Sequence, residues 1–94
     1  MIYGMYSVYD KAAKLFLSPA IDVNDDTAMR GFEQMLTVNN SAMQFRPDDY
    51  ELYQVGTFDP ETGYVSAMVP PSRLYRGSDG VLSKRLMEGY GDEV

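Results

Sequence analysis

The chain has no cysteine, no histidine and no tryptophan among its 94 residues. Without cysteine it forms no disulfide bond and offers no thiolate ligand to a metal ion. Without histidine it lacks the side chain that most often acts as a general base near neutral pH. It also lacks an apolar run long enough to cross a membrane as a helix. These absences argue against a disulfide-stabilised secreted domain, a thiolate metal centre and histidine-based catalysis.

Positive charge is also scarce. Eight Lys and Arg residues face fourteen Asp and Glu residues, which gives a formal net charge of -6 and a pI near 4.3. Nucleic-acid phosphates repel such a chain unless it has a local basic patch. Half of the positive charge lies in the last quarter of the sequence, at Arg73, Arg76, Lys84 and Arg85.

The first part of the chain is predicted to be extended. Residues 2–9 alternate apolar and aromatic side chains, a pattern that favours a strand. Residues 15–23 are a second extended segment, which Pro19 interrupts because proline donates no hydrogen bond to a sheet ladder. This second segment is either an edge strand or an interrupted arm.

A helix is predicted within residues 24–40. Its start is marked by Asn24 or Asp25, either of which can accept hydrogen bonds from the free N–H groups of a first helical turn. A single apolar stripe follows with helical spacing, at Ala28, Phe32, Met35 and Leu36. Asn39 and Asn40 are typical of a helix end, since Asn tolerates the left-handed conformation.

A β-hairpin is predicted over residues 50–69. Residues 59–63, Asp-Pro-Glu-Thr-Gly, have the composition of a tight turn between two apolar-rich runs. Simple alternation along the first run puts Tyr53 and Val55 on one side of the sheet, and Leu52 and Phe58 on the other.

These elements predict an α+β fold: a small antiparallel sheet in β-β-α-β-β order with one helix on one face. Residues 1–70 form the expected compact domain. Residues 71–94 are rich in Gly and Ser and are expected to be a flexible tail, with at most one short helix around 82–87.

The sheet face without the helix is the candidate interaction site. Apolar residues on such a face dock on a protein partner, stack single-stranded bases, or are covered within the monomer. The predicted residues of this face are Tyr3, Met5, Tyr9, Tyr53 and Tyr64.

The acidic residues indicate no catalytic or metal site. Asp22, Asn24, Asp26 and Glu33 have calcium-loop spacing, but Thr27 stands where the loop needs glycine. We find no nucleophile–base constellation and no phosphate-binding loop. We therefore expect no enzyme activity, no metal and no cofactor.

Three motifs in order resemble the small nonstructural protein of gokushovirus-type microviruses, which are single-stranded DNA phages. They are Y-S-V-Y-D at residues 6–10, N-D with A-x-R-x-F at 24–32, and D-Y-x-L-Y-x-x-G-x-F-D with T-G at 49–63. The resemblance implies a protein of the infected bacterial cytoplasm that is absent from the mature capsid. It implies a role connected with viral replication and with the switch to single-stranded DNA synthesis and packaging. It carries over no catalytic or binding residue.

Three functions follow. The first is a protein–protein adaptor whose tyrosine face docks on a viral replication or procapsid protein, or pairs two copies as a homodimer; no membrane is involved. The second is a single-stranded DNA binder, with Arg73, Arg76, Lys84 and Arg85 neutralising phosphates. The third is an acidic DNA mimic that inhibits a host factor through Asp22, Asp25, Asp26, Asp48, Asp49 and Glu51.

Overall fold

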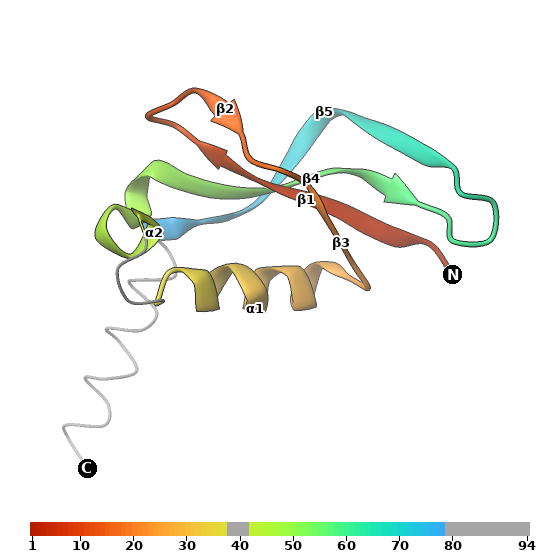
Figure 1. Cartoon of the computed structure of the whole chain (residues 1–94), viewed down its shortest axis with the longest axis horizontal. Helices are drawn as coiled ribbons and strands as arrows, with labels where there is room; N and C mark the ends of the chain where they lie inside the picture. The colour runs from red at the N-terminus through yellow and green to blue at the C-terminus, as the bar shows by residue number, and fades with distance from the viewer. Residues whose placement is uncertain (38–41, 79–94) are drawn as a thin grey trace, which may run out of the picture.

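The computed structural model describes residues 1–37 and 42–78, and Figure 1 shows one sheet with a helix lying along one face. The helical elements are α1 (Asp25–Met35), α2 (Ala42–Phe45) and the single 3-10 turn η1 (Pro47–Asp49). The strands are β1 (Tyr3–Asp10), β2 (Leu15–Phe16), β3 (Ala20–Asp22), β4 (Tyr50–Phe58) and β5 (Val65–Arg76). The predicted α+β fold is therefore confirmed.

All strand pairs in the sheet are antiparallel. The order is β2-β1-β4-β5, and β3 also pairs with β1. Because β4 runs along one edge of β1, the two short strands β2 and β3 share the other edge. The segment around Pro19 is thus an edge strand in two pieces, which settles the choice between an edge strand and an arm. Ser7 on β1 binds the segment between β2 and β3, because its Oγ donates a hydrogen bond to the Leu17 carbonyl at 2.6 Å.

Helix α1 begins where the sequence predicts. Asn24 is the N-cap, and its side chain accepts a hydrogen bond from the Thr27 N–H at 2.8 Å. Phe32 is the most deeply buried side chain, at 2% exposure, and its ring meets that of Tyr75 edge-on at 6.0 Å. The buried apolar core joins the helix to the sheet and comprises Tyr6, Val8, Ala28, Phe32, Leu36, Met43 and Leu52. The expected helix end at Asn39 and Asn40 lies outside the described residues.

The predicted hairpin joins β4 to β5 through the expected turn. Asp59 accepts from the Glu61 N–H through its side chain, and Gly63 has the positive φ of 76° that the turn requires. The β4 strand contains a bulge, because Met5 pairs with Gly56 while Tyr6 pairs with Gln54. Val55 is the extra residue, so the faces switch there. Phe58 pairs with Tyr3 and therefore lies on the side away from the helix, which corrects the assignment from simple alternation.

The compact domain was expected to end at residue 70. This is wrong for the next six residues, 71–76, which belong to the sheet. Strand β5 continues through Pro70 and Pro71 to Arg76, and Ser72, Arg73, Tyr75 and Arg76 all pair with β4. An edge strand tolerates proline because one side of it makes no ladder hydrogen bonds. The rest of the predicted tail, including the helix expected around 82–87, lies outside the described residues. No helix in the described ranges is long and apolar enough to span a membrane.

Candidate functional site

An aromatic cluster occupies the sheet face opposite α1. We call this side the open face. Three rings from three strands pack together there, with centroid separations of 4.8 Å for Tyr9–Phe16, 5.4 Å for Phe16–Tyr53 and 6.1 Å for Tyr9–Tyr53. Strand pairing places Phe16 opposite Tyr9, which explains why the arm contributes a ring to this cluster.

The open face extends beyond the three rings. Directly paired residues share a face, so the register assigns further side chains to it. Tyr3 pairs with Phe58, Met5 with Ile21, and Phe58 with Val65. Phe16, Ile21 and Val65 are 43%, 49% and 61% exposed, so the face is an accessible apolar surface rather than part of the core.

A buried carboxylate lies beside the aromatic cluster. Glu51 is only 7% exposed, although it sits on the open face opposite Tyr9. Its Oε1 accepts from the Tyr53 hydroxyl at 3.2 Å, and its Oε2 pairs with Arg73 Nη1 at 3.4 Å. Burial, and next the charge of Glu51, raises the pKa of Tyr53 above its ordinary value, so this hydroxyl stays protonated at neutral pH.

The register also brings basic residues to this face. Arg73 pairs with Tyr53, and Arg76 pairs with Glu51. Sequence reasoning placed both arginines in a tail, because Pro70 and Pro71 looked like the end of the sheet. The other two predicted phosphate contacts, Lys84 and Arg85, lie outside the described residues.

Four of the five predicted face residues lie together on the open face: Tyr3, Met5, Tyr9 and Tyr53. Tyr64 is different, because it lies in the turn just before β5 and is 74% exposed. Phe16, Phe58 and Glu51 are members that sequence reasoning missed. Phe16 could have been found by pairing the two runs across the Asp10–Lys14 turn, which places it opposite Tyr9.

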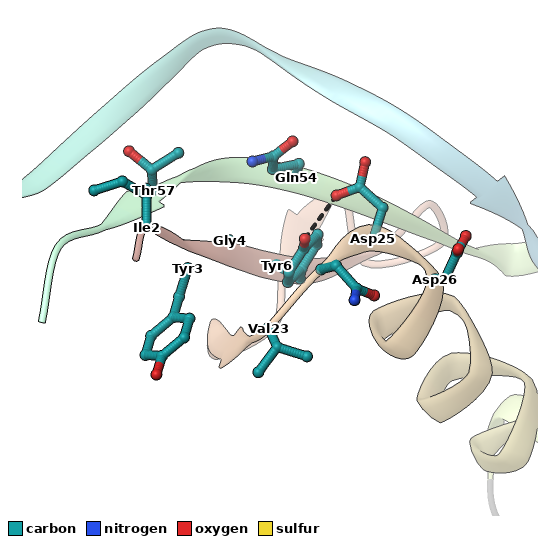
Figure 2. A pocket seen from close by; sticks show the side chains of 10 residues that line it. Ile2, Tyr3, Gly4, Tyr6, Val23, Asp25, Asp26, Gln54 and Thr57 are labelled. Atoms are coloured by element: carbon teal, nitrogen blue, oxygen red, sulfur yellow. Dashed lines mark hydrogen bonds between the residues drawn. The ribbon is translucent and has the colours of Figure 1, made fainter.

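A second feature is an open hollow of about 560 Å³ at the N-terminus of α1. Figure 2 shows a hydrogen bond between two of its lining residues, which the Tyr6 hydroxyl donates to Asp25 Oδ1 at 2.6 Å. The Tyr6 ring reaches this position by crossing Gly4, where a Cβ would collide with it. Burial, and next the bond to Asp25, raises the pKa of Tyr6 well above its usual range. Among the residues that the structure describes, two carboxylates, Asp25 and Asp26, line the hollow and no basic side chain does.

The six acidic residues of the DNA-mimic hypothesis are divided among separate places. Asp25 and Asp26 line the hollow, while Asp48 and Asp49 line another beside Phe45. Asp22 borders an apolar groove between β3 and α1, and Glu51 is buried on the open face. No group of three or more acidic residues in the described ranges is arranged to hold a metal ion.

The fold and the site define a small α+β protein with one helix-covered sheet face and one exposed aromatic face. Residues 3–80, most of the chain, match the Phage ORF5 protein family. The chain belongs to this family and is a phage protein. No curated protein and no solved structure matches it.

Proposed function

We propose that this phage protein is a nonenzymatic adaptor that docks on another protein through its open face. The observation that carries the proposal is the Tyr9–Phe16–Tyr53 cluster on a sheet face that α1 leaves uncovered. Tyr and Arg side chains are enriched among the residues that contribute most to protein–protein binding energy. Tyr53 and Arg73 stand together on this face, joined through the buried carboxylate of Glu51.

The resemblance to gokushovirus nonstructural proteins supports the biological setting. We infer that the protein acts in the host cytoplasm during viral genome replication or the switch to single-stranded DNA synthesis and packaging. Its partner would be a viral replication or procapsid protein. The net charge of -6 favours a protein partner over a phosphate backbone.

The ring geometry favours protein docking over base stacking. Phe16 and Tyr53 meet at an interplanar angle of 82°, and Tyr9 and Tyr53 at 76°. In these edge-to-face contacts one ring face is occupied by the edge of its neighbour. Stacking a base requires a free ring face, so each such contact removes part of the platform.

The test measures binding of the purified protein to each replication and procapsid protein of the same phage by biolayer interferometry. Truncating Tyr53 to Ala should weaken the true complex by about 2 kcal/mol, or roughly thirtyfold in Kd. Phe45→Ala is the matched control, because Phe45 is 73% exposed but lies on α2. Equal affinity of wild type and Tyr53→Ala for the partner would refute docking through this face.

Single-stranded DNA binding is the second candidate, and one observation favours it. Arg73 and Arg76 stand on the open face beside the aromatic cluster. The negative charge of Glu51 on this face is already offset by its ion pair with Arg73. Fluorescence anisotropy of labelled single-stranded DNA at low salt tests it. Binding that weakens with salt and with Arg73→Gln, but not with the helix variant Arg30→Gln, would favour this candidate. Absence of binding at low salt would eliminate it.

A further inference from the structure

The outer edge of β5 presents an uncharged, exposed strand. In the described part of the chain β5 is the last strand of the sheet, so its outer backbone groups have no ladder partner. Val65 and Val69 are 61% and 87% exposed, and every position from Thr62 to Ser72 is uncharged. Figure 1 shows this hairpin continuing beyond the N-terminal end of α1. Exposed apolar edges of this kind are templates for pairing with another strand.

The direction of the backbone groups can be followed from the turn. The Asp59 N–H donates to the Tyr64 carbonyl at 2.9 Å, which marks this as a hydrogen-bonded position of the ladder, although the Tyr64 N–H donates to Thr62 Oγ1 instead. Hydrogen-bonded and non-hydrogen-bonded pairs alternate along an antiparallel ladder. Val65 and Ala67, which pair with Phe58 and Gly56, therefore direct their own N–H and C=O groups outward.

The side chains of this segment are self-complementary. In an antiparallel pair of two β5 strands centred on Ala67, Ala67 faces Ala67 of the second copy, and Val65 faces Val69. Alternation along β5 places these three residues on one face, so the pairing creates two valine–valine contacts around a small residue at the two-fold axis. The flanking charges agree with this orientation. Glu61 lies before the segment and Arg73 after it, so antiparallel copies bring opposite charges toward each other.

We propose that a second copy of this chain pairs with β5, edge to edge and antiparallel, with the two-fold axis at Ala67. The two sheets then become one continuous sheet. The axis is perpendicular to this sheet, so both open faces lie on the same side and both α1 helices on the other. The dimer would present two aromatic clusters on the same side of the joined sheet, toward its opposite ends, which raises avidity for a partner with two suitably spaced binding sites. This inference uses a different surface from the open face and does not depend on the proposed function.

The proposed pairing between two β5 strands cannot extend beyond Val69 toward the C-terminal end of β5. From Ala67 to Ser72 β5 advances five residues while β4 advances two, from Gly56 to Gln54. The extra residues include Pro70 and Pro71, which cannot donate to a new ladder. The available edge is therefore the short segment Val65–Val69, which specifies one register and predicts a weak, reversible dimer rather than a growing fibre.

Cysteine cross-linking tests the register cleanly, because the chain has no cysteine of its own. Ala67→Cys should form a disulfide-linked dimer about a hundredfold faster than Thr62→Cys, an exposed turn variant. Val65→Cys alone should not cross-link, since its copy in the partner would lie about 14 Å away, beyond the reach of a disulfide. Mixed with Val69→Cys, it should cross-link.

The oligomeric state gives an independent readout. Analytical ultracentrifugation over a concentration series should show reversible dimers for the wild type and monomers for Ala67→Lys, which places two like charges at the axis. Thr62→Lys carries the same charge change and should still dimerise. Monomers at every concentration, or a dimer indifferent to Ala67→Lys, would overturn the proposal. Rapid cross-linking of Val65→Cys alone would overturn its register.

Discussion

The hydrogen bond between Tyr6 and Asp25 joins the first turn of α1 to a central strand of the sheet, and we expect it to stabilise the fold. Its oxygen–oxygen distance is 2.6 Å, and Tyr6 is only 5% exposed, whereas Asp25 is exposed. Hydrogen bonds to charged groups contribute about 1.5–3 kcal/mol. Solvent around an exposed carboxylate weakens this contribution, so we expect about 1 kcal/mol.

Removing the hydroxyl tests this value. Tyr6→Phe keeps the ring that crosses Gly4 and should lower the free energy of unfolding by about 1 kcal/mol. In a domain of this size that loss corresponds to a fall in Tm of about 4–8 °C. Urea denaturation followed by far-ultraviolet circular dichroism measures it.

A double-mutant cycle with Asp25→Ala separates the hydrogen bond from other effects of each substitution. The coupling energy should be about 1 kcal/mol, because the second substitution has nothing left to break. Tyr3→Phe is the matched control, since the described residues provide no hydrogen bond to the Tyr3 hydroxyl and its removal should leave stability unchanged. Additive losses in the cycle, within roughly 0.3 kcal/mol, would refute this account of how α1 is anchored.

Two further predictions concern the same core. Because the pKa of Tyr6 is raised in the folded protein, the unfolded chain loses this proton first, near pH 10. The stabilisation is therefore complete below pH 10 and is lost as the pH rises above it, and Tyr6→Phe should lose less stability than the wild type between neutral pH and about pH 11. Parallel alkaline losses in urea titrations of the two proteins would contradict this. Phe32→Ala, at a position 2% exposed, should cost about 3–5 kcal/mol and largely unfold a domain this small. Thermal unfolding measures this loss. Met35→Ala on the same helix is the control, because Met35 is 44% exposed and its loss of stability should stay below about 1.5 kcal/mol. Equal losses for the two variants would refute the burial argument.

The site shows where sequence reasoning reaches its limit. Tyr9 and Tyr53 were predicted to share a face because alternation is a local property of each strand. The membership of Phe58 was missed, since one extra residue at Val55 switches the face of everything after it. Arg73 and Arg76 were predicted as phosphate contacts, but in a tail, because prolines usually end a strand. Pro70 and Pro71 instead lie within an edge strand, which needs no donor on one side, and the strand carries both arginines to the open face.

The sequence by itself determined the local elements of this phage protein. The Asn24 cap, the apolar helical stripe and the Asp59–Gly63 turn depend on contacts between residues a few positions apart, so their signals are visible in the chain. Only the tertiary structure decided what meets on the open face. Phe16, Tyr53 and Arg73 come together through strand pairing across long stretches of chain, and register depends on the bulge and on packing over the whole sheet.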